Sequence, residues 1–165
     1  MKQDNDKNEQ VRTTPEAQAD GNLDYTDRKI TESNHKSVKA REMGMDTYYH
    51  NHTEEFSDIK DGKNAMDIIS ENGCKLEIDT YWSFCAGIDN STYLPENKDK
   101  IVLVHVKDGV DRKPTALGEG ENDLAKVKEG VEAIGLEWII LENDDPVPTG
   151  LEDITRSYKW LKNNF

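Results

Sequence analysis

Apolar residues follow two different periods along residues 45–165, and each period predicts a different element. Four runs are β-prone, alternating or continuously apolar, and we expect them to form strands: DTYYHNH, KLEIDTYW, IVLVHVKD and EWIILEND. Three runs place apolar residues at helical spacing and predict amphipathic helices: GKNAMDIISENG, NDLAKVKEGVEAIG and TGLEDITRSYKWLK. The run DNSTYLPENKDK, interrupted by Pro95, predicts a weak helix or a loop. The predicted order is therefore β-α-β-(α)-β-α-β-α.

The last predicted helix begins with a capping box, in which Thr149 is followed by Glu152 three residues later. Its apolar residues recur every three or four positions, and we expect this stripe to be buried: Leu151, Ile154, Tyr158 and Leu161. Strands that alternate with amphipathic helices indicate a parallel sheet covered by helices. No predicted strand is followed by G-x-G-x-x-G or a P-loop, so the nucleotide-binding versions of this fold class lack their signature.

The N-terminal part of the chain has a different pattern. Larger apolar residues are sparse in residues 1–45, and no two of them are adjacent. We expect residues 1–30 to be polar and poorly ordered, because they cannot bury enough apolar area to offset chain entropy. The run SNHKSVKAREMG contains helix formers and ends at Gly44, which favours a short helix. Residues 31–165 are expected to form the folded unit.

Polar side chains stand at the ends of all four predicted strands: His50 and His52, Asp79, His105 with Lys107, and Glu142. In α/β folds of this class, chemistry collects at the carboxyl ends of the strands. If the strands line a barrel, their period of two brings one imidazole or carboxylate from each strand to a common rim. A mixed set of imidazoles and carboxylates suits a divalent cation such as Mn²⁺, Mg²⁺, Co²⁺ or Zn²⁺.

Each of these residues also has a structural interpretation. A histidine that ends an apolar strand is often solvent-facing, and an aspartate after a strand commonly caps the next helix. Asp108 and Asp144 fit that second description, and Glu142 fits a solvated strand end. The metal interpretation depends on the coincidence of four such residues on four consecutive strand ends.

Composition narrows the range of partners. The chain has 34 acidic and 21 basic residues and a formal net charge of −13, which disfavours nucleic acid and anionic membrane surfaces as partners. No run of 18 apolar residues and no N-terminal apolar h-region are present, so we expect neither a membrane span nor a secretory signal. Cys74 and Cys85 match no zinc or C-x-x-C spacing, and we interpret them as reduced thiols of a cytoplasmic protein.

Six motifs follow one another between about Ser33 and Phe165: YHNH, E-I-D-T-Y-W, H-V-K-D, L-G-E-G-x-x-D, L-E-N-D and L-E-D-I-x-x-S-Y-x-x-L. Together they resemble the sugar phosphate isomerase/epimerase family, the xylose isomerase-like TIM barrels. The resemblance implies a (β/α)₈ barrel with a divalent metal at its C-terminal rim. A complete barrel of this type needs eight strands and about 250 residues. We therefore expect an α/β fold that is a partial (β/α)₈ TIM barrel, with about the last four β/α units and a polar N-terminal extension.

The resemblance also implies roles for individual residues. The implied metal ligands are the four strand-end residues His50, Asp79, His105 and Glu142. Many relatives have a glutamate at the position of His50, which puts the usual relay of two glutamates in doubt and makes Glu55 a conceivable substitute. The implied catalytic residues are Glu142, His52 and Lys107. The implied substrate-binding residues are His52, Trp82, Lys107 and Glu119.

The activity implied by the resemblance is that of an isomerase or epimerase of a small sugar or sugar phosphate, which removes the proton next to a carbonyl through a metal-stabilised enediolate. One alternative is a lyase similar to keto-inositol dehydratases. Another is a non-catalytic half-barrel that serves as a remnant or a binding module. Four strands leave two open edges and an exposed inner face, so a homodimer or a complementing half-barrel chain is the expected assembly.

Overall fold

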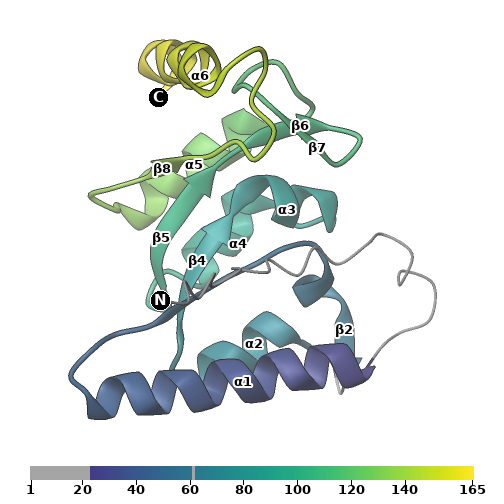
Figure 1. Cartoon of the computed structure of the whole chain (residues 1–165), viewed down its shortest axis with the longest axis vertical. Helices are drawn as coiled ribbons and strands as arrows, with labels where there is room; N and C mark the ends of the chain where they lie inside the picture. The colour runs from purple at the N-terminus through teal and green to yellow at the C-terminus, as the bar shows by residue number, and fades with distance from the viewer. Residues whose placement is uncertain (1–22, 61) are drawn as a thin grey trace, which may run out of the picture.

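The computed structural model describes residues 23–60 and 62–165 (Figure 1). The first element is α1 (Leu23–Glu42), a helix of 20 residues that starts well before the short helix predicted from the sequence. The predicted boundary at residue 30 therefore lies inside this helix, whereas residues 1–22 lie outside the described part. Arg41 of α1 donates hydrogen bonds to the carbonyl oxygens of Asn72 and Gly73, which ties the end of α1 to the turn before the second sheet strand.

Four strands form one parallel sheet in the order β1-β4-β5-β8. They are β1 (Tyr48–His50), β4 (Lys75–Asp79), β5 (Ile101–Val106) and β8 (Ile140–Leu141). The four predicted strands and their parallel arrangement are thus confirmed. Two strands are shorter than their apolar runs. β4 ends at Asp79, because the Asp79 side chain caps the next helix, and β8 holds only two residues.

Helices connect successive strands of this sheet and follow the last one. They are α2 (Ala65–Glu71), α3 (Thr80–Cys85), α4 (Asn90–Glu96), α5 (Leu124–Ile134) and α6 (Gly150–Asn164). Three small elements complete the chain: η2 (Glu54–Phe56), the hairpin of β2 (Asp58–Lys60) and β3 (Lys63–Asn64), and the hairpin of β6 (Asp108–Val110) and β7 (Lys113–Thr115). None of the described helices is long and apolar enough to cross a membrane.

Polar caps define where the helices begin. Half of the capping box predicted for α6 is present: the backbone N–H of Glu152 donates to the Thr149 side chain, but the Glu152 carboxylate accepts from the Thr149 hydroxyl rather than from the Thr149 backbone N–H. Asn64 and Asp67 form a complete reciprocal box at α2. Gly135 ends α5 in the left-handed region at φ 66°, which suits a residue without a side chain.

The core lies on the face of the sheet that the helices cover. Alternate side chains of β4 and β5 are fully or almost fully buried there: Leu76, Ile78, Val104 and Val106. They pack with apolar side chains of the connecting helices: Met66, Ile69, Leu94, Leu124, Val127 and Val131. Because successive strand residues point to opposite faces, the positions between them, such as Glu77 and His105, point away from this core.

The predicted burial of the α6 stripe is wrong for three of its four residues. Leu151, Ile154 and Tyr158 are 77%, 39% and 53% exposed, and only Leu161 packs against the core. Polar contacts hold the buried side of α6 instead. Asp153 accepts hydrogen bonds from the side chain of Asn143 and the backbone N–H of Val147, and Ser157 accepts one from the backbone N–H of Leu117.

Candidate metal centre

Four side chains from the four sheet strands meet at one end of the sheet. His50 ends β1, Asp79 ends β4, His105 lies in β5 and Glu142 follows β8. One potential ligand atom from each lies within 4.8 Å of every other. The four residues that the sequence predicted as metal ligands are therefore brought together, and their role as ligands remains a prediction.

The register of the sheet explains this convergence. His50 is level with Glu77, Asp79 is level with His105, and His105 is level with Ile140. Parallel strands that share a register place side chains of equal parity on one face and at one height. Asn51 locks the ends of β1 and β4 together, because its buried side-chain amide accepts from the backbone N–H of Asp79 at 2.9 Å and donates to the carbonyl oxygen of Asp79 at 3.3 Å.

Asp79 is fully buried, and its two carboxylate oxygens have different surroundings. Oδ1 accepts the backbone N–H groups of Tyr81 and Trp82 at 2.9 and 3.0 Å, which fixes the orientation of the carboxylate. Oδ2 makes no hydrogen bond; it lies 3.3 Å from Nζ of Lys107, in an ion pair, and 3.8 Å from Nε2 of His50. Burial raises the pKa of Asp79 to about 6, and the charge of Lys107 opposes that rise. An unsatisfied, oriented carboxylate oxygen is a suitable ligand for a cation.

His50 offers a second unsatisfied atom, because its Nδ1 is buried and lacks a hydrogen-bond partner. Burial and then the neighbouring His105 lower the pKa of His50, so the ring is mostly neutral at pH 7. A neutral imidazole is the form that binds metals. Two imidazoles and two carboxylates with two orphaned buried atoms thus fit a divalent cation of the Mn²⁺, Co²⁺ or Zn²⁺ type.

His105 lies between two carboxylates. Its Nδ1 is 2.6 Å from Oε2 of Glu142, and its Nε2 is 2.9 Å from Oε1 of Glu77. Burial lowers the pKa of His105, but the hydrogen bond and charge of Glu142, followed by the charge of Glu77, outweigh that effect and raise it. The same hydrogen bond from His105 holds the pKa of Glu142 at about 2. Glu142 is therefore ionised at neutral pH, and a cation must displace a proton from the pair.

Lys107 is fully buried beside the four donors. Its Nζ lies 3.3 Å from Oδ2 of Asp79, 3.5 Å from Oε2 of Glu142 and 2.5 Å from Oδ2 of Asp144. Burial lowers the pKa of Lys107, but the charges of these carboxylates raise it overall. The ammonium group therefore stays charged and compensates part of the local negative charge.

Two aromatic side chains border the cluster on one side. The His52 ring lies 5.4 Å from that of His50 and 6.0 Å from that of Trp82, and Nζ of Lys107 lies 5.0 Å from the Trp82 ring centroid. Nε1 of Trp82 is a buried donor without a hydrogen-bond partner. His52, Trp82 and Lys107, three of the predicted substrate-binding residues, thus lie together next to the predicted ligands.

Two other candidate residues make different contacts. Glu119 forms an ion pair with Arg156 of α6, with Oε1 2.8 Å from the guanidinium Nε, at the exposed surface. Glu55 accepts the Tyr49 hydroxyl and the backbone N–H of His52 at 2.8 and 2.9 Å. These bonds make Glu55 a support for the loop after β1, and no contact places its carboxylate among the four donors.

Sequence reasoning missed two residues that contact the cluster. Glu77 hydrogen-bonds His105, and its Oε2 lies 3.7 Å from Nδ1 of His50. Its position two residues before Asp79 was the available signal, since period two puts both on one face. Asp144 fits a helix cap in the sequence, yet it pairs with Lys107. The ion pair between Lys107 and Asp144 joins two loops that are distant in the sequence, so no local sequence pattern predicts it.

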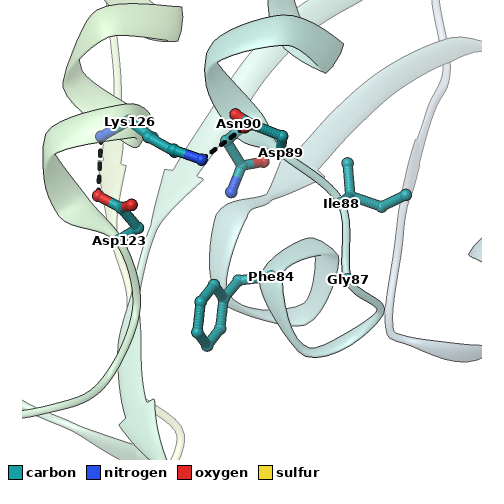
Figure 2. A pocket seen from close by; sticks show the side chains of 7 residues that line it. All are labelled: Phe84, Gly87, Ile88, Asp89, Asn90, Asp123 and Lys126. Carbon is teal, nitrogen blue, oxygen red and sulfur yellow. Dashed lines mark hydrogen bonds and ion pairs between the residues drawn. The ribbon is translucent and has the colours of Figure 1, made fainter.

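A separate cavity of about 260 Å³ lies where α3, α4 and α5 approach one another (Figure 2). On its wall, the Lys126 ammonium group pairs with Asp89 at 2.6 Å, and the backbone N–H of Lys126 donates to the Asp123 side chain at 3.2 Å. The remaining lining residues are Phe84, Gly87, Ile88 and Asn90. None of the four predicted ligands lines this cavity.

A family profile described as the xylose isomerase-like TIM barrel matches residues 10–164. The chain belongs to this family. The expected family membership and the partial-barrel fold are therefore confirmed. No curated protein matches the chain.

Solved structures of the xylose isomerase-like type share the fold at low sequence identity. A sugar phosphate isomerase/epimerase from Parabacteroides distasonis is 21% identical with a TM-score of 0.65, and the match covers 85% of this chain and 54% of that one. An L-ribulose 3-epimerase is 15% identical with a TM-score of 0.63, covering 86% and 54%. The D-allulose 3-epimerase from Methylomonas sp. solved with D-allulose is 14% identical with a TM-score of 0.60, covering 85% and 55%. The chain thus spans about half the length of these structures.

Proposed function

We propose that this chain carries the metal-binding and proton-transfer residues of a divalent-metal-dependent sugar isomerase or epimerase. The observation that supports the proposal is the convergence of His50, Asp79, His105 and Glu142, with Oδ2 of Asp79 and Nδ1 of His50 buried and unsatisfied. Solved structures with the same fold include an L-ribulose 3-epimerase and a D-allulose 3-epimerase. A free ketose is therefore the first substrate class to test.

Glu142 is the proposed base. Its carboxylate is ionised at neutral pH, because His105 holds its pKa at about 2, and its side chain is 27% exposed and open to a ligand. A bound divalent cation would supply Lewis-acid polarisation of a substrate carbonyl, which makes the neighbouring C–H group more acidic. A positioned carboxylate that accepts such a proton contributes about 10²–10⁴-fold in rate.

Lys107, His52 and Trp82 are the proposed substrate-binding residues. The Lys107 ammonium group lies 3.5 Å from Glu142, so it can donate to a substrate oxygen next to the reacting carbon. Trp82 offers a buried Nε1–H donor and an aromatic face that can pack on the apolar side of a sugar ring. His52 is exposed beside Trp82, where its ring nitrogens can hydrogen-bond a substrate hydroxyl group.

The number of catalytic acid–base groups determines whether an isomerisation or an epimerisation is feasible. An isomerisation moves one carbon-bound proton between adjacent carbons on one face of the substrate, which Glu142 can do, and one hydroxyl proton between the two oxygens, for which Lys107 is the proposed donor. Inversion at one carbon needs a second group on the opposite face, where many relatives have a glutamate and this chain has His50. The proposed chemistry is therefore an isomerisation with Glu142, or an epimerisation in which His52 provides the second proton.

Metal titration tests the binding part of this proposal. We expect purified protein, stripped with chelator, to bind about one Mn²⁺ or Co²⁺ per chain by isothermal titration calorimetry. Because His105 holds a proton between two carboxylates, binding should release protons, seen as a dependence of the measured enthalpy on the buffer's ionisation enthalpy. His105→Gln should abolish binding, and His35→Gln, at an exposed histidine of α1, should leave it unchanged.

Proton exchange tests the chemical part. The metal-loaded protein is incubated with D-allulose or L-ribulose in D₂O, and loss of the C–H signal next to the carbonyl is followed by ¹H NMR. We expect exchange that depends on metal and on Glu142. Metal binding without exchange on any ketose tested would contradict the enzymatic proposal and favour the non-catalytic half-barrel. Loss of a hydroxyl group as water would instead identify the keto-inositol dehydratase type of lyase.

A further inference from the structure

Exposed apolar side chains gather at the two ends of the sheet. In the part of the chain that the structure describes, ten large apolar residues are exposed, and only Val110 lies away from the two edge strands. One group, the β1-edge surface, runs from α1 to β1 and consists of Val38, Met43, Met45 and Tyr48. The other, the β8-edge surface, runs from the start of β8 into α6 and consists of Trp138, Val147, Leu151, Ile154 and Tyr158.

These two surfaces adjoin the two open edges of the sheet. Within the described residues, β1 pairs only with β4, and β8 pairs only with β5. The helices next to these strands, α1 and α6, lie at opposite ends of the row of elements (Figure 1). Open strand edges and apolar patches of this kind are sites of association.

Tyr48 and Trp138 belong to the inner face that a closed barrel would fill. Tyr48 has the same parity along β1 as His50, which points to the metal cluster. Trp138 has the same parity as Ile140 of β8 and is 70% exposed. In complete barrels, inward side chains of the strands pack in layers at the centre. Tyr48 and Trp138 are therefore exposed on a face that a closed barrel would cover.

We propose that two copies of this chain pair edge to edge and close an eight-stranded barrel. A two-fold axis along the barrel would place β8 of each copy beside β1 of the other. The two contacts would be identical, and all eight strands would be parallel. Four strands per copy give the eight at which this type of barrel closes. The chain spans about half the length of the solved relatives, so two copies together match the length of one of them.

This arrangement specifies which helices meet. α1 precedes β1 and α6 follows β8, so both run opposite to the strands and lie parallel to each other across the new contact. Val38 and Tyr158 lie at similar distances from the C-terminal ends of these helices, and they are 50% and 53% exposed. The pairing buries the β1-edge surface of one copy against the β8-edge surface of the other, and it brings two clusters of four donors to one rim.

Mass measurement tests the pairing independently of any catalytic activity. In size-exclusion chromatography with light scattering, we expect a mass of twice 18.8 kDa at micromolar concentration, with dissociation on dilution. Because each copy carries a net charge of −13, added salt should screen the repulsion and favour the dimer. A folded monomer at every soluble concentration and salt would overturn the proposal.

Charge variants test which surfaces meet. Tyr158→Glu and Val38→Lys should each weaken the dimer by about tenfold or more, because each places a charge in a contact that occurs twice. Val110→Glu, at the exposed apolar residue away from both edges, should have no effect. Circular dichroism checks that all three variants fold.

A mixture of the two charge variants gives the sharpest result. In a mixed dimer, one contact places the carboxylate introduced by Tyr158→Glu in one copy against the ammonium group introduced by Val38→Lys in the other. The second contact keeps its original Val38 and Tyr158, so mixing should restore the dimer. If the mixture stays monomeric, or if Val110→Glu disrupts the dimer as strongly as Tyr158→Glu, the edge-to-edge arrangement is wrong.

Discussion

Asp79 and Asp108 are both buried aspartates at the ends of apolar strand runs, but their carboxylates accept different numbers of hydrogen bonds. The Asp108 carboxylate accepts four backbone N–H groups, those of Gly109, Gly118, Gly120 and Asn122, at 2.9–3.0 Å. Asp79 accepts two N–H groups on Oδ1 and leaves Oδ2 unsatisfied among His50, His105 and Glu142. Both oxygens of Asp108 thus accept hydrogen bonds from its own loop, whereas Oδ2 of Asp79 makes no hydrogen bond and has only the ion pair with Lys107 at 3.3 Å.

The comparison shows how to distinguish a structural carboxylate from a candidate ligand. Both residues lie at the end of an apolar run, both are buried, and both accept neighbouring backbone N–H groups, so burial and position do not separate them. What separates them is whether the second carboxylate oxygen accepts a hydrogen bond. Buried polar atoms without a partner are rare and costly in folded proteins, and they therefore mark a site where a ligand is expected.

The largest expected effect is on metal affinity at Asp79. Asp79→Asn keeps an oxygen to accept the N–H groups of Tyr81 and Trp82 but replaces the charged oxygen that faces the other donors. We expect metal affinity to fall by about 10³-fold, or about 4 kcal/mol. Calorimetric titration with Mn²⁺ measures it. Asp108→Asn is the matched control, and an equal loss of affinity in both variants would remove the distinction between the two aspartates.

The second effect is on stability at Asp108. Asp108→Ala leaves four buried or half-buried N–H groups without an acceptor, and we expect the free energy of unfolding to fall by about 3 kcal/mol. Urea unfolding followed by circular dichroism measures the change. A loss below about 1 kcal/mol would show that this carboxylate does not organise the loop from Gly118 to Asn122.

A smaller effect is expected at Glu77, which orients His105 through its Nε2. Glu77→Gln preserves the shape but weakens this contact, and we expect metal affinity to fall by about 10–100-fold, as is usual for residues that support a ligand. The matched control is Glu71→Gln, because Glu71 is an exposed glutamate paired with Lys63. An affinity equal to that of the unmodified protein would place Glu77 outside the site.

The smallest effect concerns the stability of metal-free protein. Asp79 has a raised pKa of about 6, so the folded state retains a proton that the unfolded state loses near the usual value of 3.8. The free energy of unfolding therefore falls as pH rises from about 4 to about 6, and this loss persists at neutral pH. Asp79→Asn should make the metal-free protein more stable by about 1–2 kcal/mol at pH 7 and have little effect at pH 4. Thermal unfolding at both pH values checks this; a variant less stable at pH 7 would contradict it.

Much of the fold could be predicted because it depends on local periodicity. The alternating run KLEID and the continuously apolar run IVLVHV located two strands, and the period of two placed Asp79, His105 and Glu142 at one rim. The resemblance to the family added the barrel and the idea of a missing half. These inferences needed only the order of residues within single elements.

The parts that the sequence did not predict depend on contacts between distant segments. The stripe of α6 identified an apolar face, but whether Leu151 and Tyr158 are buried depends on what packs against them, which periodicity cannot show. Asp108 resembles a helix cap, yet its acceptor role depends on N–H groups up to 14 residues later. The pairing of Lys107 with Asp144 likewise joins loops after two different strands.

Anomalous diffraction from crystals of the protein grown with Mn²⁺ would show directly whether the four side chains hold a metal. We expect one strong anomalous peak bounded by Nδ1 or Nε2 of His50, Oδ2 of Asp79, a ring nitrogen of His105 and the Glu142 carboxylate, with none at Asp108. We also expect Asp79→Asn crystals to lose that peak. A fully ordered cluster without anomalous density at saturating Mn²⁺, or a peak that persists in Asp79→Asn, would show that this cluster is not the metal site.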